Sequence, residues 1–441
     1  MLWRHLCLVR AWSAAGLFTC AILGSAALAV TEPAEPTPSS EGTETVGILD
    51  AQKSGEVKLK LRGQGEDRVR FSVQNTSTKR LRVILPPGLV AANATGQLQS
   101  MGLGTATNST GSFGSFRSVA PEAGLRSVPP EEGDRPDAVA VPAGQTVEFS
   151  VRAVCLNYGL PTPTPRDAFQ LMDVDDYSPD PRVRRALRTL ATMGTSHGVA
   201  QAVMWNVCNN VPFAMMAKQF AKMMNSHEVA LAGRFIEALD ASGSSETLDP
   251  AYLAEGRVYI HVRAEGPLYR DAKRLNAELE GLRILGLPVR TVNENETPTT
   301  SAPALLLSIN LTAGRPGETR GRISVRHITD VSGWLPLGQA SFATGSDSTE
   351  LTGEELTKAV DHAVAAAFVT AKPTRRAVGS TTLKIENRLP FTLKTVVVKA
   401  GNSAGAPSVA LSALGIGPAK TGLAPIEAAT GTVDRVELNG L

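Results

Sequence analysis

The sequence predicts a multidomain α+β protein. We expect an immunoglobulin-like β-sandwich, a small helical domain, an α+β sheet-and-helix domain and a short β-rich C-terminal module. Two observations support this organisation. The hydrophobic period changes several times along the chain, and 441 residues exceed what one hydrophobic core usually serves. A hydrophobic content of 42% with 20% charged residues is typical of folded globular proteins.

The first 29 residues have the order of a secretory signal peptide. Arg4 and Arg10 precede an apolar run, and Ala27-Leu28-Ala29 has the small residues that a signal peptidase needs. We therefore expect a secreted, periplasmic or cell-surface protein. Residues 30–45 are rich in Pro, Ser, Thr and Glu and are predicted to be a disordered linker. Because no later apolar run is long enough to span a bilayer, we expect no integral membrane insertion after cleavage.

Residues 46–155 alternate apolar and polar side chains, which is the period of half-buried strands. This segment is predicted to form the β-sandwich. Its expected strands are 57–61, 69–73, 81–85, 139–141 and 147–153. The Gly/Ser/Thr-rich stretch 89–137 is predicted to be a long loop, and its role is not indicated by the sequence.

Residues 156–242 have the period of helices and are predicted to form the small helical domain. Asp180-Pro181 offers a cap and a proline suited to a first helical turn, and an apolar stripe continues to Met193. A second helix is expected from about Ser196 to before Pro212. Two more are expected at about 213–225 and 227–241.

Residues 256–371 mix the two periods and are predicted to form the α+β domain, with helices on one face of a sheet. Residues 372–441 are predicted to form the β-rich module, reached through a linker that contains Pro373. Because a module of about 60 residues is marginally stable alone, we expect it to dock on another domain. The expected strands are 258–262, 289–292, 304–312, 321–328, 334–344, 381–387 and 391–399, and the expected helices are 269–285 and 352–370.

One short pattern occurs twice. Leu383-x-Ile385-x-Asn387, followed by Leu393, parallels Phe71-x-Val73-x-Asn75, followed by Leu81. A repeated sandwich hairpin is one interpretation. Chance is the other, because hydrophobic alternation next to a turn asparagine is common.

Two cysteines, Cys155 and Cys208, remain after signal cleavage. In an oxidising compartment they favour a disulfide, which would join the sandwich to the helical domain. Closing a loop of this length stabilises a fold by about 4 kcal/mol in the chain-entropy model. On this hypothesis the chain is an exported, non-enzymatic interaction or structural protein. Free thiols are a further alternative.

The flanks of Cys155 and the segment from Val199 to Trp205 resemble the two signature segments of bacterial thioester domains, which are surface adhesin modules. In that family a cysteine after a strand bonds to the side chain of a glutamine in a Gln-x-x-x-Trp helix. The resemblance implies that Cys155 supplies the thiol, Gln201 the acyl group and Trp205 a shielding aromatic ring. A thioester is an activated acyl group that can acylate an amine on a target. The alternative function is therefore a covalent adhesin.

Other candidate sites have plainer explanations. Acidic residues cluster near a predicted helix start, but they do not complete the pattern of a calcium-binding loop. They are expected to be solvated. Methionines near His227 suit copper(I), but methionine at helical spacing usually packs in a core. We therefore expect no metal or cofactor. These acidic residues are Asp173, Asp175, Asp176 and Asp180, and these methionines are Met204, Met215, Met216, Met223 and Met224.

Charge and motifs narrow the classes of partner. The net charge is +2, with 44 basic residues against 42 acidic ones and 5% aromatic residues, so no nucleic-acid partner is expected. Three arginines on one helical face, Arg182, Arg185 and Arg188, suit an anionic polymer, although a solvated face is the usual explanation. The sequence contains no recognised hydrolase motif, and its histidines are scattered along the chain. The expected partner is an envelope or extracellular protein or glycan.

Overall fold

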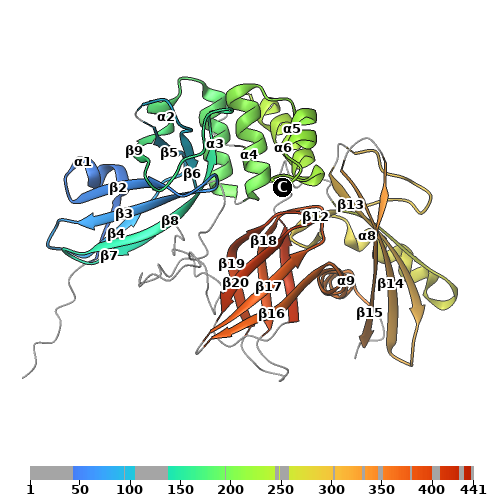
Figure 1. Cartoon of the computed structure of the whole chain (residues 1–441). Coiled ribbons are helices and arrows are strands. Elements are labelled where there is room, and N and C mark those ends of the chain that lie inside the picture. The colour runs from blue at the N-terminus through green and yellow to red at the C-terminus, as the bar shows by residue number, and fades with distance from the viewer. Residues whose placement is uncertain are drawn as a thin grey trace, which may run out of the picture. The chain divides into compact units, whose positions relative to one another are not determined.

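The computed structural model describes residues 43–93, 95–104, 138–193, 195–243, 248, 258–300, 303–329, 333–345, 351–377, 380–399, 408–426 and 432–438. Residues 42–441 form one compact unit, distinct from residues 1–41. The predicted signal peptide and most of the predicted linker lie outside the described residues. The fold is mixed α+β and mostly β, with five sheets among the described residues (Figure 1).

Two β-layers share the first hydrophobic core. One is a closed barrel in the order β2-β3-β8-β6-β5-β9, and the other is a three-stranded sheet in the order β1-β4-β7. Apolar residues of both layers form a single buried cluster. An immunoglobulin-like strand order is therefore not confirmed. The strands are β1 (Glu44–Gly47), β2 (Val57–Gly63), β3 (Arg68–Asn75), β4 (Leu81–Ile84), β5 (Leu89–Ala92), β6 (Met101–Leu103), β7 (Ala138–Val141), β8 (Thr146–Cys155) and β9 (Ala168–Asp173).

Three boundaries of this region differ from the prediction. β1 begins inside the predicted linker and pairs in parallel with β4. β5 and β6 lie inside the predicted 89–137 loop, of which residues 105–137 are outside the described part. Both strands are short and buried on both faces, so they carry no alternation to detect. β9 closes the barrel after Cys155, so the barrel extends beyond the predicted boundary at residue 155.

The predicted helices follow, with clear start signals. The Ser196 side chain caps α4, and Asn225 and Glu228 form a reciprocal capping box on α6. α5 is shorter than expected. The helices are α1 (Ile48–Lys53) within the first region and then α2 (Val174–Tyr177), α3 (Pro181–Met193), α4 (His197–Asn209), α5 (Phe213–Gln219) and α6 (Ser226–Ala241).

The predicted α+β arrangement is a six-stranded sheet with two long helices. The strand order is β11-β12-β10-β13-β14-β15, with β10 parallel to both of its neighbours. α8 contacts β10 and β12, α9 contacts β15 and β11, and the two helices contact each other. The elements are β10 (Val258–Ala264), η1 (Gly266–Leu268), α8 (Tyr269–Leu279), β11 (Arg283–Ile284), β12 (Leu287–Thr291), β13 (Ala304–Ala313), β14 (Glu318–Ile328), β15 (Leu335–Gly345) and α9 (Gly353–Phe368).

The C-terminal module consists of two three-stranded sheets, β16-β17-β20 and β19-β18-β21. The predicted linker at Pro373 is wrong, because this proline lies in β16. The strand tolerates it at the edge of its sheet, beside a register shift. The strands are β16 (Val369–Ala377), β17 (Ser380–Asn387), β18 (Leu393–Lys399), β19 (Ser408–Ile416), β20 (Thr421–Ile426) and β21 (Thr432–Leu438).

The repeated asparagine pattern forms the same corner twice. Asn75 and Asn387 are both buried, and each ends a strand whose successor lies in another sheet. Each carboxamide oxygen accepts from the backbone two residues later, at Ser77 and Leu389, 2.9 Å away in both cases. Each amide nitrogen donates to the backbone oxygen four residues later. The two patterns therefore have one structural cause, because a buried backbone corner needs hydrogen-bond partners.

The C-terminal module contacts the helical region through a buried carboxylate. Glu228 has no exposed side-chain area and receives an ion pair from Lys420, with Nζ 2.7 Å from Oε2. Ser196 donates to the other carboxylate oxygen at 2.7 Å. The Asn225 amide nitrogen also donates to the backbone oxygen of Pro418 at 2.8 Å. Since a buried charge is costly without partners, this junction fixes the turn between β19 and β20 against α4 and α6.

Candidate functional site

The candidate site forms where helix α4 crosses the last residue of strand β8. Cys155 ends β8 and is 2% exposed, and Gln201 lies on the second turn of α4 and is 1% exposed. α4 is held against the chain after β8 at its other end too, because the Asn209 carboxamide accepts a hydrogen bond from the backbone N–H of Tyr158 at 3.1 Å. The helix therefore has a fixed position along this segment.

Gln201 pairs with the backbone of Cys155 on both sides of its carboxamide. The Cys155 N–H donates to Oε1 at 2.9 Å, and Nε2 donates to the Cys155 carbonyl at 2.8 Å. Both bonds are buried and satisfy groups that would otherwise be costly. The structure thus brings together two of the three residues that the thioester hypothesis named.

The barrel itself explains why Cys155 has a free backbone edge. On one edge β8 pairs with β6 as far as Cys155, opposite Met101. On the other edge the ladder to β3 ends at Arg152, opposite Arg68, and the Ala153 N–H donates to the Asp67 carbonyl at 2.9 Å. Beyond that point no strand within the described ranges continues the ladder. Gln201 occupies the next pairing position in the way a neighbouring strand would.

The Cys155 thiol lies against the turn between β2 and β3. Its Sγ atom is 3.6 Å from the backbone oxygen of Glu66. Burial raises the pKa of the thiol to about 12, with further contributions from the Glu66 and Asp67 carboxylates. The thiol is therefore protonated at neutral pH, and it needs a base before it can act as a nucleophile.

His197 is a residue that sequence reasoning did not place in the site. Its ring lies near the Glu66 backbone, the group that the Cys155 thiol also contacts. Burial lowers the pKa of His197 to about 4, so the ring is neutral at physiological pH. Its Nε2 atom is buried and has no hydrogen-bond partner among the described residues. The available signal was its spacing: His197 precedes Gln201 by four residues, one helical turn.

Trp205, the third residue of the thioester hypothesis, belongs to an aromatic cluster with Tyr158 and Phe220. Its ring centroid is 5.2 Å from that of Tyr158 and 5.0 Å from that of Phe220. Trp205 is 4% exposed, whereas Tyr158 is 36% exposed. These three aromatic rings form an apolar cluster beside α4, at the Tyr158 end of the segment that follows β8.

Both cysteines are free in the structure, and they face different surroundings. Cys155 belongs to the barrel cluster, whereas Cys208 packs at the edge of the larger cluster formed by the helices and later sheets. Cys208 follows Gln201 by seven residues, about 10 Å along the helix. The Cys155–Cys208 disulfide is not formed in this structure and stays a prediction.

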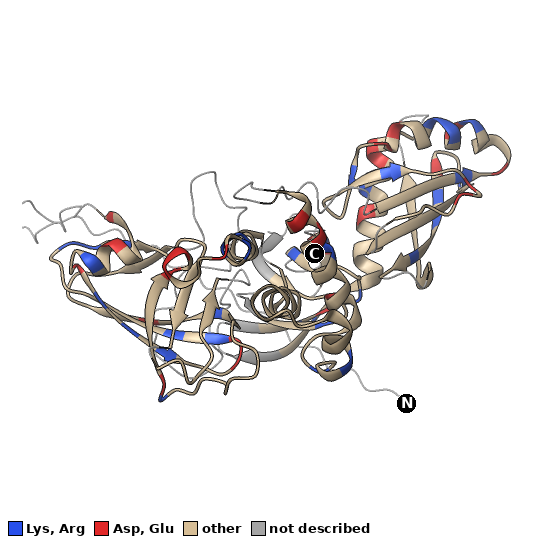
Figure 2. Ribbon diagram, turned by 90° about the horizontal axis from the view of Figure 1, so that it is seen from above, with Lys and Arg blue, Asp and Glu red and all other residues tan. Residues whose placement is uncertain are grey.

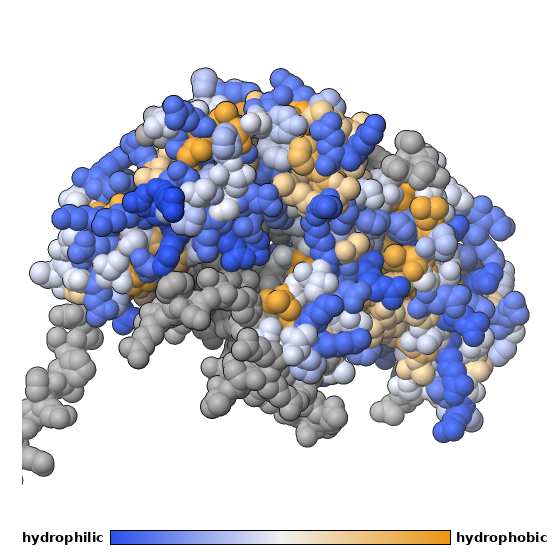
Figure 3. All heavy atoms as spheres, in the orientation of Figure 1, coloured by the Kyte–Doolittle hydropathy of each residue, from blue (hydrophilic) through white to orange (hydrophobic). Residues whose placement is uncertain are grey.

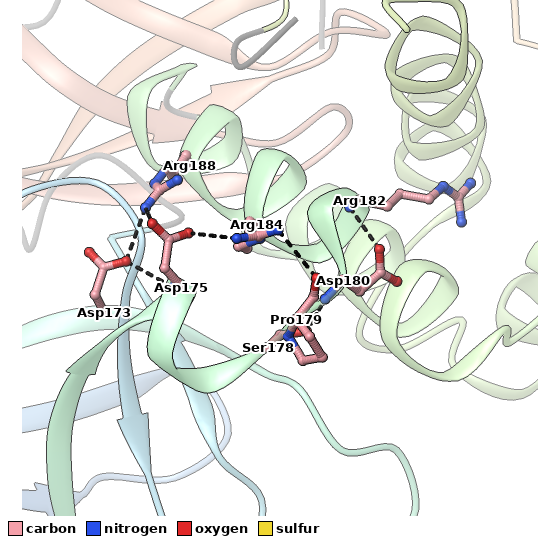
Figure 4. A network of polar contacts seen from close by, with 8 residues as sticks. All are labelled: Asp173, Asp175, Ser178, Pro179, Asp180, Arg182, Arg184 and Arg188. Carbon is pink, nitrogen blue, oxygen red and sulfur yellow. Dashed lines mark hydrogen bonds and ion pairs between the residues drawn. The ribbon is translucent and has the colours of Figure 1, made fainter. Parts of the chain in front are cut away.

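The predicted acidic loop meets the predicted arginine face at Arg188 (Figure 4). Arg188 bonds to Asp173 at 3.0 Å and to Asp175 at 2.8 Å. The Arg188 hydrogen bond is also the main cause of the lowered pKa of Asp175. Asp180 accepts from the Arg182 backbone N–H at 2.8 Å, and the Arg182 side chain binds Asp240. Asp173, Asp175 and Asp180 are thus engaged by arginines and backbone groups at the helix starts.

The methionines suggested for copper pack in or against the larger hydrophobic cluster. His227 instead lies beside His327, with ring centroids 5.4 Å apart. Within the described ranges, no three His, Cys, Asp or Glu residues are grouped in a way that suits a metal ion.

The surface has mixed character. Lys and Arg are interspersed with Asp and Glu along the ribbon (Figure 2). On the face seen in Figure 3, hydrophobic residues form small separate groups among hydrophilic ones. No helix in the described part of the chain is long and apolar enough to span a membrane. No family model matches this chain, and no curated protein matches it either.

Proposed function

We propose that this chain is an exported binding protein that attaches covalently to its partner through an internal thioester between Cys155 and Gln201. The observation that carries the proposal is the pairing of the Gln201 carboxamide with both backbone groups of Cys155. A thioester can form only if the side-chain carboxamide of the glutamine lies next to the cysteine that supplies the sulfur. Cys155 and Gln201 are 46 residues apart in sequence, so this proximity comes from the packing of α4 on β8.

The chemistry balances without any cofactor. The Cys155 sulfur attacks Cδ of Gln201, the S–C bond forms, and the C–N bond breaks. The thiol proton leaves with the nitrogen as ammonia. An amine on the partner later attacks Cδ, a C–N bond forms, the C–S bond breaks, and the thiol regains a proton. Because each molecule reacts once with its target, this is covalent binding rather than enzymatic turnover.

Burial suits the storage of such a bond. Both residues are at most 2% exposed, so bulk water has little access to the acyl carbon. The Glu66 side chain is exposed and lies close enough to influence the thiol electrostatically. A carboxylate at this position attracts an ammonium group. The expected target is therefore the lysine side chain of an extracellular or envelope protein.

The test is the intact mass of the secreted protein under non-reducing conditions. A thioester lowers the mass expected from the mature sequence by about 17 Da through loss of ammonia. A Cys155–Cys208 disulfide would lower it by about 2 Da. The Cys208→Ala variant should keep the loss of about 17 Da, and Cys155→Ala should abolish it. An unchanged wild-type mass, or a loss that depends on Cys208, would contradict the proposal.

A further inference from the structure

The site contains a base that the thioester proposal leaves unused. His197 and Gln201 are one turn apart on α4, so their side chains lie on the same face of the helix. The His197 ring and the Cys155 thiol both contact the backbone of Glu66. One backbone group of the β2–β3 turn therefore brings the imidazole and the thiol to the same place. Gln201 joins them through its hydrogen bonds to Cys155.

A buried polar atom normally has a partner, and Nε2 of His197 has none in the part of the chain that the structure describes. One ring nitrogen of His227, His261 and His327 is unpartnered there too, so what distinguishes His197 is its place on the same face of α4 as Gln201. The ring also lies near the Glu66 backbone, which the Cys155 thiol contacts. A neutral ring with an unpartnered nitrogen, one helical turn from Gln201, is able to take up a proton.

We propose that His197 carries the proton during formation of the thioester. Its imidazole accepts the proton of the Cys155 thiol as sulfur attacks Cδ of Gln201, and then delivers this proton to the departing nitrogen, which leaves as ammonia. The S–C bond forms, the C–N bond breaks, and His197 ends in its starting state. This inference rests on the proposed thioester function and assigns the residue that makes it possible.

The electrostatics of the site set the resting protonation states of the thiol and the ring. Because the thiol pKa is raised to about 12, the sulfur is protonated and needs a base. Because the pKa of His197 is lowered to about 4, its ring is neutral and able to accept a proton. Asp67 favours the protonated ring, whereas Arg152 and Lys420 oppose it. The imidazolium is thus short-lived, and proton transfer accompanies the bond changes at Cδ.

The same residue must act in reverse when an amine opens the thioester. The attacking amine loses a proton and the sulfur gains one, so the microscopic path is shared. The rate at which methylamine opens the thioester, measured by intact mass, therefore reports on the proton carrier in the assembled protein. His197→Gln preserves a side chain that can donate to Glu66 but removes the base. His227→Gln is the matched control, because His227 is another half-buried histidine with a lowered pKa.

The His197→Gln variant should open about 100-fold more slowly or more, and it should leave part of the mature protein without the thioester. His227→Gln should behave like the wild type. In His197→Ala, added imidazole should restore the opening rate, which it would not do for a purely structural residue. If the wild-type mass shows the loss of ammonia but His197→Gln opens at the wild-type rate, the role of His197 is overturned and the thioester is not. A wild type that has kept its ammonia instead overturns the thioester.

If both variants fail to fold, the wild type alone decides. Hydroxylamine is a weak base and remains a nucleophile in mild acid. The rate at which hydroxylamine opens the thioester, divided by the concentration of unprotonated hydroxylamine, should be constant above about pH 5. It should fall below about pH 4, as the His197 ring becomes protonated. A rate that is constant through that range would contradict the inference.

Discussion

The two cysteines of the described chain share one property and differ in everything around them. Burial raises the pKa of both thiols to about 12. At Cys155 the neighbours are a carboxamide that pairs with its backbone and an imidazole on the same backbone carbonyl. At Cys208 the second cause of the raised pKa is the charge of Asp180, and the side chain packs against the helical cluster. Burial therefore does not distinguish a reactive site. The chemistry of the neighbours does.

Thiol labelling should give the largest contrast between the two regions. After methylamine has released the Cys155 thiol, Cys208 should react with a maleimide on the order of 100-fold faster, because Cys155 needs a larger opening of the fold. Cys208 is partly exposed, whereas Cys155 is 2% exposed. Mass mapping of the labelled peptides over time measures both rates. If neither cysteine reacts until a reductant is added, the disulfide hypothesis is correct instead.

Removal of the Gln201 carboxamide should cost more stability than removal of a comparable amide elsewhere on α4. In a Cys155→Ala background, which has no thioester, Gln201→Ala leaves a buried N–H and a buried carbonyl unpaired. The free energy of unfolding should fall by about 2 to 4 kcal/mol. The matched control is Asn206→Ala, which loses one bond to the Val211 carbonyl and should cost about 1 kcal/mol. Denaturant unfolding gives both values, and equal losses would show that the pairing at Cys155 is not special.

A smaller effect should appear in the pH dependence of stability. The pKa of His197 falls from 6.5 to about 4 on folding, so the unfolded chain binds the extra proton between these values. The stabilisation is complete above pH 6.5 and is lost as the pH falls toward 4. In the Cys155→Ala background, the free energy of unfolding should fall between pH 7.5 and pH 5. With His197→Gln added, this fall should be smaller by about 2 kcal/mol. Identical pH profiles for the two proteins would place the His197 ring in solvent.

Much of the fold follows from local signals, and the failures have physical causes. α4 and α9 start at capping residues that the sequence displays, Ser196 and Thr352. β5 and β6 were missed because strands buried on both faces have no alternating pattern. Proline is typical of linkers, but the edge strand β16 accepts Pro373. Each error comes from a tertiary neighbour that the local sequence does not show.

The site was predictable only in part for the same reason. The Gln-x-x-x-Trp spacing pointed to Gln201, and the exported context pointed to Cys155. His197 could not be connected to Cys155 from the sequence, because the link is the backbone of Glu66, more than 80 residues before Cys155. The disulfide prediction follows only from the oxidising compartment. The compartment does not indicate which side chains lie next to each thiol.

Peptide mapping after methylamine treatment tests the central claim most directly. The account predicts that the peptide containing Gln201 gains about 14 Da relative to its encoded mass, while Cys155 appears as a free thiol in the same molecules. The Cys208→Ala variant should give the same result. An unmodified Gln201, with Cys155 already free before the amine is added, would contradict the account.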